Sequence, residues 1–342
     1  MAIFDLLSAH GYGELHACRD ERTGLRALVG LYSTRLGPAI GGCRIRAYAS
    51  ETEAMEDVLR LARAMAYKAA IARLPHGGGK AVIMAPSGNF DRTALFRRYG
   101  SFVDGLGGRY VTTEDSGTSP ADMDIVRQTT RHVVGSSAGS GDPSPFTALG
   151  VRRGIEAVAH AVLGRSDLKG LRVVLQGVGH VGTHLARELV QAGADLTITD
   201  VEPQRRQAIA TELGVRAVEP GALFQVECDV LAPCALGGVI TEELVGRLRC
   251  KAVAGAANNQ LATPAVDQAL QARGIFYAPD YAINGGGLIN VAMEYAGYDR
   301  ERATSKTLAI YDTIRAIIER SRRENLPPGQ VADRMAEEIL RG

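Results

Sequence analysis

The sequence predicts an α/β protein of two domains, the second built on a doubly wound parallel sheet. The chain of 342 residues is long enough for two hydrophobic cores. An apolar, β-branched run at residues 171–176 enters a Gly-x-Gly-x-x-Gly turn at Gly177, and strand and helix patterns alternate from there on. Such alternation is typical of a parallel sheet covered by helices. Because half of the chain precedes the turn, there is room for a separate N-terminal domain of mixed α and β structure.

Composition excludes several other classes of protein. Hydrophobic residues make up 46% and charged residues 23% of the chain, and the formal net charge of +1 favours neither nucleic acid nor an anionic membrane as a partner. No apolar run of about 18 residues could span a membrane. The five cysteines form no C-x-x-C pair, so we expect no disulfide framework and no metal site. Residues 1–5 lack a signal-peptide pattern, which predicts a cytoplasmic protein.

The strongest helix signal in the N-terminal half follows a predicted strand at residues 27–32 and begins at Ser50. Ser50 and Glu53 form a capping-box pattern. The apolar positions after it recur in steps of three and four, at Ala54, Val58, Leu61 and Met65. The next step falls on Lys68. A lysine near a helix end commonly extends its amine to water, so the position alone does not show whether Lys68 has a function.

A second lysine and an aspartate lie beside predicted strands. Residues 77–79 are three glycines, expected to form a turn, and Lys80 then opens an apolar strand. That position favours a desolvated ammonium, a feature of lysines that take part in proton transfer. Asp115 follows a predicted strand at residues 110–113, where α/β proteins often place reactive groups, although a simple turn aspartate is equally compatible with the sequence. His76 and His180, each beside glycines, are expected at the surface.

The chain divides best in the small, polar segment at residues 135–143. The predicted N-terminal domain comprises residues 1–135 together with a C-terminal helix at about 325–342. The second domain comprises residues 136–324, with further strands at about 196–199, 215–218, 229–231, 252–254 and 275–278. We expect a deep cleft between the two domains.

The glycine turn predicts binding of a dinucleotide. Gly177 allows the tight turn, Gly179 lets the backbone approach a pyrophosphate, and Gly182 lets the following helix pack closely on its strand; Val178, His180 and Val181 stand between them. The helix N-terminus offers free N–H groups to the phosphates. Asp200 ends the next strand, at about the 20-residue offset expected of a ribose-binding acid. This order of elements is that of a Rossmann domain.

Asp200 also favours NAD as the cofactor, because its charge would repel the 2′-phosphate of NADP. Two nearby arginines, Arg205 and Arg206, argue in the opposite direction. We expect them on the solvated face of a helix at residues 203–213.

Six segments spread over the chain resemble the amino acid dehydrogenases of the glutamate, leucine, phenylalanine and valine family, and most closely its leucine, phenylalanine and valine branch. They are residues 37–42, 65–68, 77–80, 113–118, 255–260 and 279–287. The resemblance implies NAD-dependent, reversible conversion of an L-amino acid to the 2-oxo acid and ammonia by a homo-oligomer. It implies that Lys68 holds the substrate carboxylate, that Lys80 polarises substrate and water, and that Asp115 exchanges protons with the amino group.

The other site residues that the resemblance implies form two groups. Those assigned to the cofactor, besides the glycine turn and Asp200, are Thr147, Ala235 and Asn258. Those assigned to the substrate, besides Lys68, are Ile40, Gly41, Gly42, Thr113, Asn284, Leu288 and Val291.

The side-chain pocket implied for the substrate is aliphatic. Glutamate-specific relatives carry a lysine immediately before the Gly-Gly pair, and this chain has Ile40 there. Burying an unpaired carboxylate against isoleucine would cost several kcal/mol, which excludes glutamate. With Thr113, Leu288 and Val291 completing the pocket, we expect leucine, valine or isoleucine. One methylene contributes only about 1–3 kcal/mol of discrimination, so phenylalanine and tryptophan stay open as alternatives.

Two further classes of function stay open. A malic-type oxidative decarboxylase would need clustered acids for a divalent metal, and no such set lies near Lys80 in the sequence. A catalytically silent, NAD-sensing regulator would keep the glycine turn but has no use for Lys68, Lys80 and Asp115 together.

Overall fold

The computed structural model describes residues 3–11 and 14–342, which divide into two compact units. Unit 1 runs to Gly141 and resumes over Asn290–Arg300 and Ala336–Gly342, whereas unit 2 comprises Asp142–Ile289 and Glu301–Met335. The change at Gly141 lies within the predicted linker. The assignment of substrate to residues 1–135 and about 325–342, and of cofactor to residues 136–324, stays a prediction. The signal-peptide expectation rests partly on residues 1–2, which lie outside the described residues.

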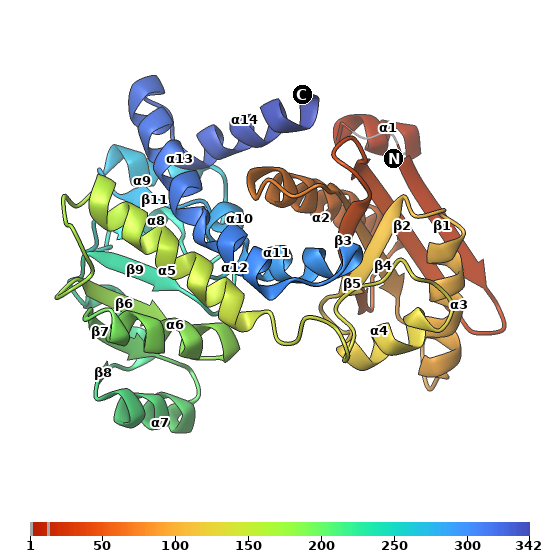
Figure 1. The fold of residues 1–342 in the computed structure, drawn as a ribbon, viewed down its shortest axis with the longest axis horizontal. Coiled ribbons are helices and arrows are strands. Elements are labelled where there is room, and N and C mark those ends of the chain that lie inside the picture. Colours follow the sequence, from red (N-terminus) through yellow and green to blue (C-terminus); the bar gives the residue numbers. More distant parts are fainter. Residues whose placement is uncertain (1–2, 12–13) are drawn as a thin grey trace. The chain divides into compact units, whose positions relative to one another are not determined.

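Unit 1 is built on a five-stranded mixed sheet (Figure 1). In spatial order the strands are β1 (Glu14–Asp20), β2 (Leu25–Ser33), β4 (Gly77–Met84), β3 (Ala39–Arg46) and β5 (Tyr110–Glu114). β1, β2 and β4 pair antiparallel, and β4, β3 and β5 pair parallel. The carboxyl ends of β4, β3 and β5 therefore meet at one edge of the sheet, with β3 between the other two.

Helices cover both faces of this sheet. The helices of unit 1 are α1 (Ile3–Ala9), α2 (Glu51–Ile71), α3 (Arg92–Asp104), α4 (Pro120–Arg127) and the 3₁₀ helix η2 (Met293–Ala296). α1 and α2 pack on Val82 and Met84, whereas α3 and α4 pack on the opposite face around Phe96 and Tyr99. Ser50 caps α2 as predicted by accepting from the Glu53 N–H.

The three glycines before Lys80 do not form the predicted turn, and that prediction is wrong. They are the first residues of β4, so Lys80 is the fourth residue of the strand. A Cβ on Gly77 would lie 1.8 Å from the Ser33 carbonyl oxygen, and one on Gly78 would lie 2.0 Å from the Ala66 nitrogen in α2. The glycines therefore allow close packing of β4 against β2 and α2.

Unit 2 is a doubly wound sheet with all strand pairs parallel, which confirms the predicted fold class. In spatial order the strands are β11 (Phe276–Tyr277), β10 (Ala252–Val253), β9 (Val230–Pro233), β6 (Arg172–Gln176), β7 (Asp195–Thr199) and β8 (Arg216–Ala217). The strand order reverses between β6 and β9, and open α/β sheets bind ligands at the carboxyl ends of the strands at such a point. The glycine turn follows β6 directly.

Unit 2 has helices between its strands, before the first strand and after the last one. They are α5 (Ser144–Ala161), α6 (His180–Gln191), α7 (Pro203–Leu213), η1 (Pro220–Gln225), α8 (Glu242–Val245), α9 (Ala265–Ala272), α10 (Asp280–Ile283), α12 (Arg300–Leu308) and α13 (Ile310–Glu324). α11 (Gly286–Ala292) and α14 (Pro328–Arg341) contribute residues to both units. Over residues 3–11 and 14–342, no helix is long and apolar enough to cross a membrane.

The predicted linker is held by fixed contacts on the unit 1 side. The Glu294 carboxylate accepts from the Gly135 N–H at 2.8 Å and from the Ser140 N–H at 2.7 Å. The Asn290 Nδ2 donates to the Ser140 hydroxyl at 2.9 Å. Residues 135–140 are therefore an ordered part of unit 1.

Candidate active site

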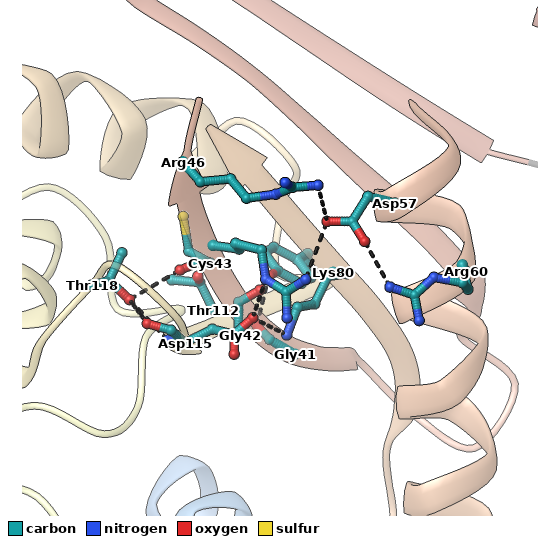
Figure 2. A network of polar contacts seen from close by, with 12 residues as sticks. Gly41, Gly42, Cys43, Arg46, Asp57, Arg60, Lys80, Thr112, Asp115 and Thr118 are labelled. Atoms are coloured by element: carbon teal, nitrogen blue, oxygen red, sulfur yellow. Dashed lines mark hydrogen bonds and ion pairs between the residues drawn. The ribbon is translucent and has the colours of Figure 1, made fainter. Parts of the chain in front are cut away.

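The two predicted catalytic residues form an ion pair in unit 1, in which Lys80 is buried and Asp115 is part-buried. The Lys80 Nζ lies 2.6 Å from the Asp115 Oδ2, and the lysine side chain is only 7% exposed. Lys80 comes from β4 and Asp115 directly follows β5, so the pair spans the intervening strand β3 (Figure 2). A Cβ on Gly42 of β3 would lie 2.7 Å from the Asp115 Cβ. The missing side chain at Gly42 therefore leaves the space that the pair occupies.

The charges around Asp115 keep it ionised. Burial raises the pKa of Asp115, but the attraction and hydrogen bond of Lys80 and the charge of Arg44 outweigh burial, so the pKa lies below the usual range. The Arg44 Nε donates to the same oxygen, Oδ2, at 3.2 Å. At neutral pH this carboxylate is negative and can accept a proton from a bound ligand.

Arg44 connects the ion pair to helix α2, a link that the sequence analysis missed. The Arg44 Nη1 lies 3.2 Å from the Asp57 Oδ2, which also accepts from the Tyr48 hydroxyl. The other oxygen, Asp57 Oδ1, accepts from Arg60 (Figure 2). The sequence analysis also missed Asp57, whose charged side chain is only 8% exposed. Its partners make the burial of the charge possible.

Lys68 lies in the last turn of α2 and is half-buried. Three residues earlier, the Met65 side chain lies against β3, since a Cβ on Gly41 would be 3.4 Å from the Met65 Cγ. Residues three apart share a helix face, so Lys68 continues the face of α2 that meets β3 at Gly41. A Cβ on Gly41 would also lie 1.8 Å from the Gly79 carbonyl oxygen, so this glycine is required for strand packing as well.

Three of the four predicted pocket residues belong to unit 1. Thr113 and Val291 lie near one another, because a Cβ on Gly135 would be 2.5 Å from the Thr113 Oγ1 and 3.8 Å from the Val291 Cγ1. Ile40 in β3 has no exposed surface, so it can form only the floor of a pocket. The fourth residue, Leu288, lies in the part of α11 that belongs to unit 2.

In unit 2 the glycine turn has the geometry that its pattern predicts. Gly177 adopts φ of 94°, a left-handed conformation that favours glycine. A Cβ on Gly182 would lie 1.9 Å from the Gly177 carbonyl oxygen, so α6 packs on the turn only with glycine there. The Val178 N–H donates to the Asp200 Oδ2 at 2.9 Å, which fixes Asp200 beside the turn.

The space in front of the turn fits a dinucleotide. A cavity of about 430 Å³ is lined by Val178, Gly179, His180, Thr183, His184, Arg187 and Arg205. A Cβ on Gly179 would meet no atom within 4 Å, and α6 has no side-chain cap at its N-terminus. Open space, uncapped N–H groups and nearby cations suit the phosphates of a dinucleotide. Val181 lies in the first turn of α6.

The arginines near Asp200 do not both occupy a solvated helix face, so that expectation is wrong. Arg206 is largely buried; its Nη1 donates to the Asp200 carbonyl oxygen at 2.9 Å, and it pairs with Glu219. Arg205 lines the cavity, with its Nη1 3.5 Å from the Asp200 Oδ1. A cation therefore stands next to Asp200, the predicted ribose-binding acid.

The other predicted cofactor residues lie at the carboxyl ends of neighbouring strands or beside α11. Ala235 contacts the turn, because a Cβ on Gly177 would lie 2.8 Å from the Ala235 Cβ. The sequence analysis missed two apolar side chains, Val201 and Leu236, which directly follow Asp200 and Ala235 and are 84% and 78% exposed. Exposed apolar groups on both sides of a dinucleotide turn suit contact with a flat base.

Asn258 and Asn284 are joined directly. The Asn284 Nδ2 donates to the Asn258 Oδ1 at 2.9 Å, whereas the Asn284 Oδ1 is buried and has no partner among the described residues. An orphaned buried acceptor is suited to receive a hydrogen bond from a ligand. Gln260, also missed, holds the Asn258 loop by donating to the Gly255 and Ala257 carbonyls. Thr147 lies beside α11, where a Cβ on Gly287 would be 2.6 Å from its Oγ1.

The two histidines differ. His180 is exposed as expected, but His76 is buried, with Nδ1 3.2 Å from the Pro38 carbonyl oxygen, so the surface expectation for His76 is wrong. Within the described ranges, no group of three or more His, Cys, Asp or Glu residues could hold a metal ion.

A dinucleotide turn in one unit and a buried lysine–aspartate pair in the other are the features of an amino acid dehydrogenase, and comparison with known proteins bears out this class. Residues 14–132 match the family description "Glu/Leu/Phe/Val dehydrogenase, dimerisation domain", and residues 197–320 match "Glutamate/Leucine/Phenylalanine/Valine dehydrogenase". The chain belongs to this family of NAD(P)-dependent enzymes.

Relatives match over nearly the full length. The chain is 48% identical to leucine dehydrogenase of Thermoactinomyces intermedius, over 99% of this chain and 94% of that protein. It is 46% identical to valine dehydrogenase of Streptomyces coelicolor, over 96% and 92%. Its fold matches the crystal structure of L-tryptophan dehydrogenase from Nostoc punctiforme with a TM-score of 0.91 and 38% identity, covering 99% and 98% of the two chains.

Proposed function

We propose that this enzyme catalyses the NAD-dependent, reversible oxidative deamination of aliphatic L-amino acids, with leucine preferred, to the 2-oxo acid and ammonia. The observation that carries the proposal is the buried Lys80–Asp115 pair at 2.6 Å. The printed activity of the relative at 48% identity supports leucine as the substrate. The valine and tryptophan dehydrogenases among the similar proteins keep other apolar amino acids as alternatives.

Lys68, Asp115 and Lys80 of unit 1 each have a step in this reaction. Lys68 binds the substrate carboxylate, and the ionised Asp115 takes a proton from the substrate ammonium. Bound NAD supplies the acceptor for the hydride that leaves Cα. Lys80 polarises the water that adds to the resulting iminium carbon, and this water releases one proton to solvent. Asp115 returns its proton to nitrogen, the hydroxyl group formed from water loses its proton as the C–N bond breaks, and ammonia and the 2-oxo acid leave.

The orphaned Asn284 Oδ1 and the apolar residues define the rest of the proposed substrate site. Asn284 accepts from the substrate or holds the Asn258 amide toward the nicotinamide. In unit 1, Ile40, Thr113 and Val291 are proposed for the pocket of the substrate side chain, and Leu288 of unit 2 stays a prediction of the sequence. Since Ile40 is completely buried, Thr113 and Val291 contribute most to specificity.

We propose NAD rather than NADP because Asp200 is fixed by two backbone N–H groups beside the turn, where it would meet the ribose hydroxyls. Arg205 reduces this preference by placing a cation in the same cavity. The family description of residues 14–132 as a dimerisation domain supports a homo-oligomer. The cytoplasmic location stays a prediction of the sequence.

The test is a rate measurement on a panel of L-amino acids with NAD, following NADH formation. We expect the highest kcat/KM with leucine, appreciable values with valine and isoleucine, and none with glutamate. A preference for phenylalanine or tryptophan would show that the enzyme is an amino acid dehydrogenase of this family with an aromatic substrate instead of leucine. No turnover with any amino acid would contradict the proposal and favour the NAD-sensing regulator.

A further inference from the structure

We propose that Arg44 is a positioning residue for Asp115, and that Asp57 of α2 holds Arg44 in place. The inference rests on the proposed function, because it concerns the residue that exchanges protons there. Arg44 joins the two carboxylates: its Nε lies 3.2 Å from the Asp115 Oδ2 and its Nη1 lies 3.2 Å from the Asp57 Oδ2. All three residues belong to unit 1.

Arg44 and Lys80 have different effects on the Asp115 carboxylate. Both contact Oδ2, so the two cations hold one oxygen. Lys80 is a point charge on a flexible stem, which attracts the oxygen but does not fix the plane of the carboxyl group. The planar guanidinium of Arg44 restricts rotation of that group. Oδ1 is thereby kept in one direction, available for proton exchange.

Arg44 itself is fixed from the helix side. The Asp57 carboxylate accepts hydrogen bonds from Arg44, from the Tyr48 hydroxyl at 2.9 Å and from Arg60 at 2.8 Å. The guanidinium of Arg46 lies 3.9 Å from it. Burial raises the pKa of Asp57, but these hydrogen bonds and charges outweigh burial and leave its pKa below the usual range. A permanently charged aspartate on α2 therefore anchors one side of the guanidinium while Asp115 holds the other.

The groups facing Asp115 are few enough to predict the effect of removing Arg44. Lys80 faces it from β4 and Arg44 from β3, with the Asp57 charge behind Arg44. The Cys43 thiol and the Tyr110 phenol are also near, and burial raises the pKa of Cys43 to about 12 and that of Tyr110 still further, so both are neutral. Loss of Arg44 leaves one cation, so the pKa of Asp115 rises. The acid limb of kcat/KM for leucine oxidation, which needs ionised Asp115, then moves to higher pH.

The experiment compares Arg44→Gln, Arg44→Lys and Asp57→Asn with Arg46→Gln as the matched control. Arg46 lies two residues further along β3 and contacts Asp57 and Glu53 but not Asp115. We expect Arg44→Gln to lower kcat about tenfold or more, with KM for L-leucine changed less than about threefold, since misplacement of a reacting group lowers kcat. Its acid limb shifts upward. Arg44→Lys is expected to return the acid limb of the kcat/KM profile to its wild-type pH but to recover only part of kcat. Asp57→Asn is expected to lower kcat less than Arg44→Gln does.

Arg46→Gln is expected to keep the wild-type kcat and pH profile. Equal losses in Arg44→Gln and Arg46→Gln would overturn the inference, because they would indicate general damage to β3. If Arg44→Gln does not fold, the Arg44→Lys and Asp57→Asn variants test the inference instead. Wild-type kcat in both of these variants would overturn the inference. Failure of the proposed function is distinguishable: wild-type enzyme would then not oxidise leucine. A failed inference would instead leave an active enzyme in which Asp115→Asn is inactive and Arg44→Gln normal.

Discussion

The ion-pair network of unit 1 and the glycine turn of unit 2 are built from different parts of the chain. In unit 1 the contacts are between side chains: Lys80 and Arg44 meet Asp115 at 2.6 and 3.2 Å, across three strands. In unit 2 they are mainly backbone contacts, with Gly182 packed on the Gly177 carbonyl and the Val178 N–H held by Asp200. The first region depends on charge and the second on the absence of side chains.

This difference separates what substitutions should do in each region. Removing a charge from unit 1 leaves the strands in place but removes a group needed for proton transfer. Adding a methyl group in unit 2 leaves every charge in place but changes the shape of the turn. We therefore expect turnover to depend mainly on the first region and cofactor binding mainly on the second.

The largest effect is expected for Lys80→Ala. It removes the cation that stabilises charge at the substrate, and acid–base groups of this kind typically contribute 10²–10⁴-fold, so kcat should fall by about that factor. Steady-state rates at saturating leucine and NAD measure it. If more than about a tenth of wild-type kcat remains, Lys80 does not have this role.

Two glycine substitutions test the turn. Gly182→Ala places a Cβ 1.9 Å from the Gly177 carbonyl oxygen, so we expect it to lower the free energy of unfolding by about 1–3 kcal/mol and to weaken NADH binding. Gly179→Ala is the matched control: its Cβ meets nothing within 4 Å and φ is −70°, so stability should be unchanged. Gly179→Ala should still weaken NADH binding, because its methyl group stands where we expect the pyrophosphate to approach the backbone. Thermal unfolding and calorimetric titration separate the two effects, and equal stability losses would contradict this account of the turn.

A smaller effect is expected for Asp200→Asn. It removes the charge that opposes a 2′-phosphate while Arg205 stays in the cavity, so kcat/KM with NADP relative to NAD should rise about tenfold. Arg205→Ala should change the ratio in the opposite direction. Wild-type enzyme that prefers NADP would show that Arg205, and not Asp200, determines the cofactor.

The smallest effect concerns the substrate pocket. Thr113→Gly opens space beside Val291, so kcat/KM for phenylalanine relative to leucine should rise by the equivalent of about 1–2 kcal/mol. Thr113→Ser, which removes only the methyl group, serves as the control and should shift the ratio less. An unchanged ratio in Thr113→Gly would remove Thr113 from the pocket.

The sequence predicted the backbone region better than the side-chain region, for a physical reason. Gly177, Gly179 and Gly182 act through local geometry at fixed spacing, so the pattern carries the structure. Lys80 and Asp115 could be proposed one by one, but their 2.6 Å contact depends on the strand order, which places β3 between them. The spatial order of the strands differs from their order in the chain, so the local sequence pattern does not predict it.

The incorrect expectation for the three glycines and the missed burial of Asp57 have the same origin. The three glycines before Lys80 have turn composition, yet they form strand β4 because Ala66 of α2 approaches them. Asp57 has the polarity of a surface residue, yet it is buried because Arg44 reaches it from β3. In both cases a tertiary contact overrides the local pattern.

The most direct test of this division is the affinity of Lys80→Ala for NADH, measured by isothermal titration calorimetry beside the wild-type enzyme. The cofactor residues Gly177–Gly182 and Asp200 belong to unit 2, whereas Lys80 belongs to unit 1. We predict an NADH Kd within about twofold of wild type in a variant whose kcat has fallen at least about a hundredfold. A Kd raised in proportion to the loss of kcat would contradict the account, because it would place Lys80 in cofactor binding instead of catalysis.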